Sequence, residues 1–400
     1  MIKRILWIGP MFNVETLKTR RVPNQAGTKW SWAILDALTQ HGVQVEGIAH
    51  CYEQVWPLGE RFWVGAKGWA MEKYPVHGIG YLNLPWLRER FLAWRYRRKL
   101  KQLLQCNTRA DNSNSSFDAI LGYNILFPQD IAVTEVAKRL GIPYFGIILD
   151  GEDPRRDNWG WLLRNTKYAT GLVFLSHWMV QNYPGTLPTL HFDGGGGEWK
   201  GDRAIRLREK NLIVYTGGLD YWRGVDFLAE VVRQLKNKDV RIVLCGKCDR
   251  TKIWALFGND PRVEVKGFVS EAEIDDWCCR ASVFLNVRNP QYGDNIVNFP
   301  SKIPNYLAYG KPIISTWLPS LSPEYRNLLE VIDDKDSTLF AARIEDVLRQ
   351  PDKYYQEKFK QIKVWYCAEK TWVKQTGKLL EWMNATLVSN NKGDAHKNDA

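Results

Sequence analysis

Short apolar runs alternate with segments of helical periodicity along the first half of the chain. Residues 5–8 and 43–49 are apolar runs of strand length, and residues 30–40 between them carry apolar side chains at helical spacing. The same alternation predicts strands at 118–122, 143–149 and 171–175, and helices at 86–104 and 129–140. It indicates parallel strands joined by crossover helices, which is a doubly wound α/β sheet.

The pattern stops near four consecutive glycines at 194–197 and then begins again. For these glycines a flexible linker is favoured over a hinge or a phosphate-binding loop. The second half repeats the alternation, with strands expected at 211–215, 240–244, 263–265, 282–286 and 312–315. We therefore expect a first domain over residues 1–200, a second over 201–355, helices over 356–388 that pack back on the first domain, and a disordered polar tail over 389–400.

Charge and cysteine content narrow the class of protein. The 400 residues include 55 Lys and Arg against 44 Asp and Glu, a net charge of +11. This charge suits a partner that carries phosphates, namely a nucleotide, a nucleic acid or an anionic membrane, but does not choose among them. Seven scattered cysteines and no apolar run of about 20 residues favour a reduced, cytoplasmic protein. Cys245 and Cys248 have zinc-like spacing, but a buried thiol in a strand is the favoured interpretation and no metal site is expected.

Three loops of the second half follow predicted strands. In the first, Gly217 and Gly218 let backbone N–H groups approach an anion, and Arg223 can grip a phosphate with two hydrogen bonds. In the second, Asn298 precedes Ser301, a candidate helix cap, and Lys302. In the third, residues 308–312 end a helix and begin a strand. Parallel strands place their carboxyl ends at one edge of the sheet, so the loops are expected to share a crevice.

Taken together and in this order, the loops and strands of residues 212–316 resemble the donor-binding half of a GT-B glycosyltransferase. The retaining enzymes of family 4 are the most similar, in particular the polysaccharide type with a Phe-Pro-Ser-Lys signature, which is residues 299–302 here. The resemblance implies two doubly wound Rossmann-like domains that face each other across a cleft. It also implies transfer of a sugar from a UDP- or GDP-linked donor to a saccharide or lipid-linked acceptor, in the synthesis of cell-surface polysaccharide or glycoconjugates.

The resemblance also implies roles for individual residues. Arg223 stands where the family has a phosphate-gripping lysine, and Lys302 with Ser301 would hold the other end of the diphosphate. Gly27, expected on a loop of the first domain, would close over the diphosphate or the acceptor. These positive groups would replace a metal, so no cofactor is required. The remaining donor contacts would come from Gly217, Gly218, Gly246, Gly267, Phe268 and Asn298.

The sequence departs from the family pattern at catalytic positions. The two glutamates of the family's Glu-x7-Glu pair fall at Val297 and Asn305, although an asparagine can still hydrogen-bond a ribose hydroxyl. Gly218 stands at a position where the family usually has an arginine. Asp150 and Glu152, which follow the strand at 143–149, are the local candidates for a polar catalytic role, with helix-capping acids as the alternative. Because both glutamates of this pair are missing, a GT-B protein that serves in binding or assembly without catalysis remains an alternative.

Basic and aromatic residues gather in the expected helix at 86–104. Docking on an anionic membrane face and an ordinary solvated face both fit this composition. The chain has 19 Trp, and Trp159, Trp161 or Trp222 could stack on a sugar ring, although most tryptophans are expected in the core. A nucleic-acid partner is not expected, because no known reading module is present.

Overall fold

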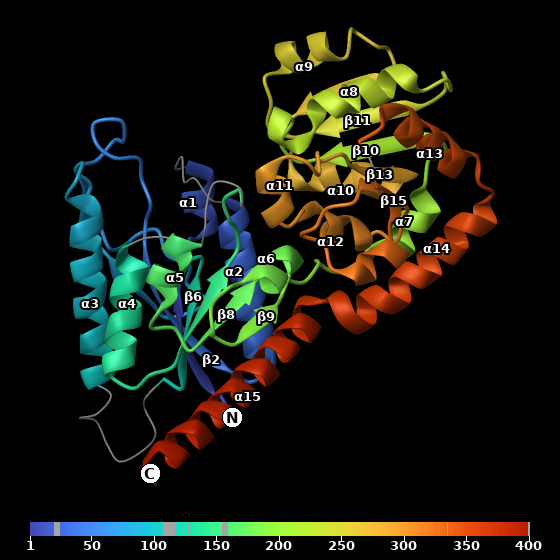
Figure 1. The fold of residues 1–400 in the computed structure, drawn as a ribbon. Helices are drawn as coiled ribbons and strands as arrows, with labels where there is room; N and C mark the ends of the chain where they lie inside the picture. The colour runs from blue at the N-terminus through green and yellow to red at the C-terminus, as the bar shows by residue number, and fades with distance from the viewer. Residues whose placement is uncertain (20–24, 107–116, 126–127, 154–158, 334, 399–400) are drawn as a thin grey trace.

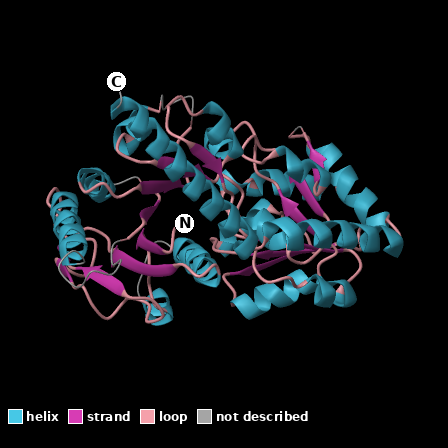
Figure 2. Ribbon diagram, turned by 90° about the horizontal axis from the view of Figure 1, so that it is seen from below, coloured by secondary structure: helices cyan, strands magenta, loops and turns pink. Residues whose placement is uncertain are grey.

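The computed structural model describes residues 1–19, 25–106, 117–125, 128–153, 159–333 and 335–398. The chain forms two parallel sheets joined in sequence, each with helices on both faces (Figures 1 and 2). This confirms the predicted α/β class with two doubly wound domains. In the part described, no helix is both long and apolar enough to span a bilayer.

The first sheet has seven parallel strands in the order β4-β2-β1-β6-β7-β8-β9. Ile5 of β1 pairs with Val45 of β2 on one side and with Ala119 of β6 on the other. The strands are β1 (Arg4–Ile8), β2 (Gln44–His50), β4 (Val76–Ile79), β6 (Ala119–Tyr123), β7 (Tyr144–Ile148), β8 (Gly171–Phe174) and β9 (Thr189–His191). A separate antiparallel pair is formed by β3 (Trp63–Val64) and β5 (Tyr81–Leu82). The helices are α1 (Val14–Thr19), α2 (Gln25–Gln40), α3 (Arg88–Cys106), α4 (Pro128–Arg139), α5 (Gly160–Thr166) and α6 (His177–Asn182).

The second sheet has six parallel strands in the order β12-β11-β10-β13-β14-β15. The strands are β10 (Leu212–Thr216), β11 (Arg241–Cys245), β12 (Val263–Gly267), β13 (Val283–Asn286), β14 (Ile313–Thr316) and β15 (Glu330–Ile332). The helices are α7 (Gly201–Leu207), α8 (Val225–Gln234), α9 (Arg250–Leu256), α10 (Glu271–Arg280), α11 (Gly293–Val297), α12 (Lys302–Leu307) and α13 (Ser337–Arg349). These strands are almost entirely buried, as expected for a sheet covered on both faces.

Two C-terminal helices lead from the second sheet back to the first. They are α14 (Asp352–Trp365) and α15 (Trp372–Asn398), separated by a π-helical turn at Tyr366–Lys370. The Ile2 N–H donates to Asn384 Oδ1 over 2.9 Å, and the ring of Trp382 lies 5.4 Å from that of Phe145. Figure 1 shows α15 running beside the first domain. The helix does not stop at the polar tail expected from residue 389, because once formed it adds a residue at small cost and no proline intervenes.

The glycines at 194–196 are closely packed and the carbonyl of Gly197 accepts a hydrogen bond, which corrects the expectation of a flexible linker. A Cβ on Gly195 would lie 2.4 Å from the backbone nitrogen of Trp372, so only glycine fits this approach. The Tyr366 hydroxyl donates to the Gly197 carbonyl over 2.5 Å. The glycine run therefore exists because the C-terminal turn lies directly against it.

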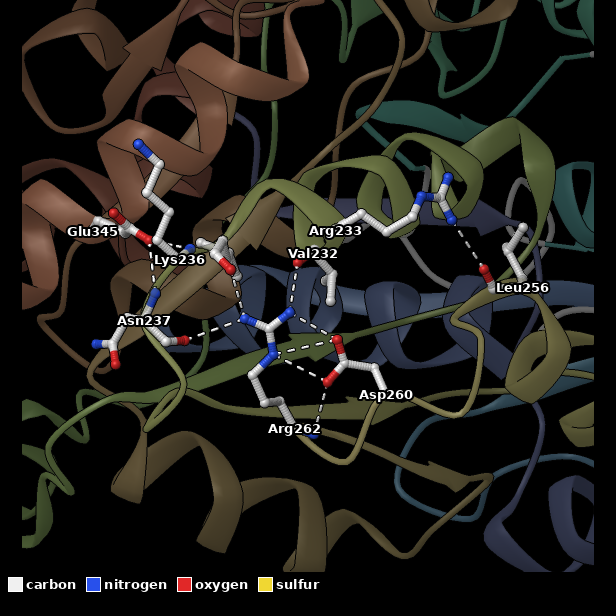
Figure 3. A network of polar contacts seen from close by, with 9 residues as sticks. Val232, Arg233, Lys236, Asn237, Leu256, Asp260, Arg262 and Glu345 are labelled. Carbon is white, nitrogen blue, oxygen red and sulfur yellow. Dashed lines mark hydrogen bonds and ion pairs between the residues drawn. The ribbon is translucent and has the colours of Figure 1, made fainter.

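An arginine fixes the end of α8 in the second domain (Figure 3). The Arg262 guanidinium donates to the carbonyls of Val232, Leu235 and Asn237 over 2.8 to 3.2 Å and pairs with Asp260 at 2.7 Å. Backbone carbonyls at a helix C-terminus have no partner within the helix. The arginine satisfies them and anchors the helix that begins directly after Arg223.

Candidate anion-binding site

The order of strands in the second sheet reverses at β10, which lies between β11 and β13. The chain passes from β10 to β11 and β12 on one side, and later to β13, β14 and β15 on the other. In open α/β sheets, ligands bind at the carboxyl edge of the strands where the order reverses. Gly217 follows β10 at this edge, and Arg288 follows β13.

Three of the predicted glycines meet at this edge through their backbones. Gly246 N–H donates to the Gly267 carbonyl over 2.8 Å, and a Cβ on Gly246 would lie 1.7 Å from the Gly217 carbonyl oxygen. Gly217 has a φ of +118°, a region that other residues rarely adopt. The structure therefore brings these glycines together and leaves the edge free of their side chains.

Lys302 points its ammonium into this edge. Its Nζ is shielded from solvent, lies 3.6 Å from the centroid of the Tyr215 ring, and has no hydrogen-bond partner among the residues that the structure describes. Burial lowers the pKa of Lys302 well below its ordinary value, the charges of Arg288 and Arg223 lower it further, and only the Asp220 carboxylate opposes them. This is a buried cation without a matching anion, which is costly unless a ligand supplies one.

Arg223 lies next to the glycine turn, beside Gly218. Its guanidinium pairs with Asp220, which also accepts the Arg223 backbone N–H over 3.2 Å. A Cβ on Gly218 would lie 2.7 Å from Arg223 Nη1, so glycine here makes room for the arginine. The structure thus brings Gly218 and Arg223 together with Lys302 around one turn, as predicted.

Arg288 is a third cation of the site, and the sequence analysis missed it. Its Nη1 donates to the Asn298 carbonyl over 3.2 Å, whereas its Nε is buried without a hydrogen-bond partner among the described residues. Burial lowers the pKa of Arg288, Tyr215 and Asp150 act to raise it, and Arg223 lowers it further. Its position in the sequence could have indicated this role, because Arg288 comes two residues after a predicted strand whose carboxyl end faces the crevice.

The predicted polar residues near Lys302 lie differently from the expectation. The Gly151 N–H of the first domain donates to Asn298 Oδ1 over 2.8 Å, and Asn298 Nδ2 donates to the Gly151 carbonyl over 3.2 Å. The Asn298 amide therefore joins the two domains and is not free for a ligand. Ser301 is exposed and its side chain makes no helix-capping hydrogen bond. Asn305 is exposed and donates back to the Ser301 carbonyl over 3.3 Å.

Asp150 and Glu152 flank Gly151 at the carboxyl end of β7. Desolvation raises the pKa of Asp150, and the nearby Arg288 charge acts against that increase, so this carboxylate of the first domain lies within electrostatic range of the cation cluster. Glu152 instead borders a small hollow of about 260 Å³, part of it open solvent. The hollow is lined by Gly151, Glu152, Trp159, Trp161, Trp178, Met179 and Val297. Val297 holds the position of the family's first glutamate, so an apolar side chain closes this wall.

The two remaining predicted residues, Gly27 and Phe268, come from α2 and from the loop after β12. Gly27 belongs to the first turn of α2 rather than to a loop, which corrects that expectation, and its carbonyl accepts the Ser31 hydroxyl over 2.9 Å. The same turn reaches the second domain through an ion pair between Lys29 and Glu271. Phe268 is 79% exposed beside Gly267. The side chain of Trp222 lies outside the part that the structure describes.

Three of the four cysteines of the second domain, Cys245, Cys278 and Cys279, are buried, and Cys248 is partly exposed. Cys245 and Cys278 are buried, and burial raises the pKa of Cys245 to about 11. Within the described residues, no three His, Cys, Asp or Glu side chains gather as metal ligands would. A thiolate is the form that binds metals, so these cysteines act as small apolar core residues.

Comparisons with known proteins place this geometry in a fold family. The family model "Glycosyl transferases group 1" matches residues 210–350, and no curated protein sequence matches the chain. Among solved structures, a sucrose-phosphate synthase from Thermosynechococcus elongatus is 11% identical with a TM-score of 0.65, over 97% of this chain and all of that one.

Two further solved structures match over similar lengths. Anabaena HepE in complex with UDP and glucose is 12% identical with a TM-score of 0.62, over 96% of this chain and all of that one. An α,α-trehalose 6-phosphate synthase from Burkholderia multivorans is 11% identical with a TM-score of 0.64, over 98% and 100%. The chain therefore has the GT-B fold, and its residues 210–350 match the model of the glycosyl transferases group 1.

Proposed function

We propose that this protein is a glycosyltransferase that moves a hexose from a nucleotide-diphosphate sugar to a saccharide or lipid-linked acceptor, with retention, in the synthesis of cell-surface polysaccharide or glycoconjugates. We further propose that it works in the cytoplasm, at the inner face of a membrane. The observation that carries the proposal is the unpartnered ammonium of Lys302 between the glycine turn and two arginines.

The chemistry of a sugar nucleotide fits this cluster. As the glycosidic bond breaks, negative charge grows on the leaving diphosphate, and fixed positive groups stabilise that charge more than they stabilise the ground state. Lys302 and Arg288 sit where no reorganisation is needed, because the surrounding chain already holds them. Arg223 can exchange its pair with Asp220 for a phosphate. We propose that these three cations stand in for a metal, with no other cofactor.

The acceptor would approach from the first domain. Asp150 lies within electrostatic range of the cation cluster and Glu152 borders the tryptophan-lined hollow, so a hydroxyl arriving between them would meet a carboxylate from either side. Aromatic rings offer flat faces to a sugar ring. We propose Trp161 and Glu152 as acceptor contacts and Asp150 as the polar group nearest the reacting bond.

The absence of the paired glutamates favours one alternative, a GT-B protein that binds a sugar nucleotide without transferring the sugar. In the structure, Val297 is buried and Asn305 is exposed at these two positions. Both functions need the donor site, and only the first needs turnover.

The test is titration of UDP, GDP and their sugars against the wild-type protein and Arg223→Ala, followed by mass measurement of donor hydrolysis. We expect one nucleotide series to bind, with an affinity about tenfold lower in Arg223→Ala because a charge-assisted hydrogen bond is lost. Binding without hydrolysis or transfer selects the alternative. No binding of any nucleotide rejects both.

A further inference from the structure

Exposed apolar side chains gather at one end of the first domain. Of the eighteen large apolar residues that are exposed among the side chains described, seven come from two adjoining segments, residues 56–63 and 86–94. They are Trp56, Leu58, Phe62, Trp63, Trp86, Leu87 and Trp94. We call this surface the aromatic tip. Trp86 is 95% exposed and Leu58 is 85% exposed, a cost that a folded protein has no internal reason to bear.

A buried asparagine holds the first segment of the aromatic tip against the stretch of chain that leads into the second. Asn83 donates from its side chain to the carbonyls of Gln54 and Arg61 over 2.6 and 3.0 Å, and from its backbone to the Phe62 carbonyl over 2.7 Å. The Trp56 N–H donates to the Asn83 carbonyl over 3.0 Å. The apolar side chains are therefore displayed on a fixed frame.

The tip continues into a strongly basic helix. Helix α3 carries seven Lys and Arg residues against one acid, Glu89. Leu92, Tyr96, Leu100 and Leu104, four residues apart, are buried against the domain. Four of the basic residues are exposed on the outer face, namely Arg90, Arg97, Arg98 and Lys101. Arg98 lies 5.7 Å over the Trp94 ring, which links the two surfaces.

We propose that the aromatic tip and the outer face of α3 dock on an anionic lipid bilayer, with the tip inserted at the level of the headgroups. Tryptophan, phenylalanine and leucine beside arginine and lysine are the composition of interfacial membrane segments, and each basic residue near an anionic surface adds about 1 kcal/mol. The segment between β2 and α3 projects from the domain (Figure 1), so it can reach the headgroup level of a bilayer that faces this end of the domain.

The position of the tip fits the proposed function, on which its biological meaning rests. A crossover helix between parallel strands begins at the carboxyl edge of the sheet and returns to the amino edge. The start of α3 is therefore on the same edge as Asp150 and Glu152, which follow β7. A bilayer held there would present a lipid-linked acceptor at the mouth of the site.

Sedimentation with vesicles tests the proposal without any donor or acceptor. Vesicles of phosphatidylcholine alone and of phosphatidylcholine with phosphatidylglycerol are compared, using the wild-type protein and a triple variant, Leu58→Ser, Phe62→Ser and Trp86→Ser. We expect binding to the anionic vesicles, at least about tenfold weaker in the triple variant. The matched control removes two exposed apolar residues of the second domain, Trp254→Ser and Leu339→Ser, and should bind as the wild type does.

A second pair of variants separates charge from apolar insertion. Arg90→Gln with Lys101→Gln should weaken binding and flatten its dependence on salt, while Trp86→Phe alone should retain it. Absence of binding to either vesicle, or equal binding by wild type and triple variant, overturns the proposal. So does self-association of the wild type that the triple variant abolishes, because the tip would then be a protein interface. Nucleotide titration without vesicles tests the proposed function separately.

Discussion

Helix α8 has a polar cluster with buried cations near each of its ends, built on Arg262 at one end and on Lys302 and Arg288 at the other. The two clusters differ in whether the hydrogen bonds of these cations are satisfied. At its C-terminus, every nitrogen of the Arg262 guanidinium donates to a carbonyl or to Asp260. At its N-terminus, Lys302 and the Nε of Arg288 have no hydrogen-bond partner among the described residues. Both clusters are largely buried, so burial of a cation alone does not indicate function.

The difference has an energetic meaning. A buried cation that is fully hydrogen-bonded stabilises the fold. Removing it leaves its former acceptors buried without a hydrogen-bond donor, which lowers the free energy of unfolding. A buried cation that lacks partners lowers the stability of the fold, because its charge is desolvated without a hydrogen bond in return. We expect such a cation where a bound ligand supplies the missing partner. The comparison therefore predicts opposite consequences for stability and for binding at the two ends of one helix.

The largest expected effect is at the unsatisfied end. Lys302→Met should reduce turnover of the donor about 100-fold or more, because a group positioned at the developing charge is removed. The same change should raise the melting temperature of the free protein, since a methionine fits the space without an unpaired charge. Steady-state kinetics and thermal unfolding measure the two effects.

A fall in melting temperature together with full activity would contradict this assignment of Lys302. Lys252→Met serves as the matched control, because that lysine is exposed on the second domain and pairs with Asp249 at 3.8 Å. It should change neither quantity, as expected for a surface ion pair.

The next effect is at the satisfied end. Arg262→Met should destabilise the second domain by about 3 kcal/mol, because Asp260 loses its partner and three carbonyls at the end of α8 lose their donors. Nucleotide affinity, measured by calorimetry at a temperature where the variant is folded, should stay within about twofold of the wild type. A large loss of affinity with little loss of stability would show that the two ends of α8 are not separable in this way.

The sequence could predict one of these clusters in part and the other not at all. Gly217, Gly246 and Lys302 were found because the carboxyl ends of parallel strands meet at one edge, a rule that needs only the order of strands and loops. Arg288 obeys the same rule but carries no family signature in the pattern. Arg262 could not be found, because its partners belong to a helix end some 25 to 30 residues earlier.

Contacts between the domains escaped prediction for the same reason. Asn298 was expected to contact a ligand, whereas its amide is held by Gly151, which lies 147 residues earlier in the chain. The glycines at 194–197 were expected to be flexible, whereas those at 194–196 pack against a turn near residue 370. The composition of a segment shows which conformations and contacts are possible for it. Contacts with residues far away in the sequence determine which of them it adopts.

The smallest expected effect concerns protons. Burial, Arg288 and Arg223 keep the pKa of Lys302 well below its ordinary value of 10.5, and a bound diphosphate would raise it again. Binding should therefore take up part of a proton at pH values above the lowered pKa. The measurement is made where a terminal phosphate with a second pKa of about 6 is already ionised. Affinity should fall as pH rises through the lowered pKa.

Calorimetry in two buffers of different ionisation enthalpy, such as HEPES and Tris, measures this uptake directly. Lys302→Arg is the informative variant, because arginine stays charged throughout this range and should bind the nucleotide without proton uptake. In the free wild-type protein, the unfolded state binds more protons than the folded state between the lowered pKa and 10.5, so stability should rise with pH over that interval. Lys302→Arg should lack that rise as well, and an unchanged rise would mean that some other buried group releases its proton on folding.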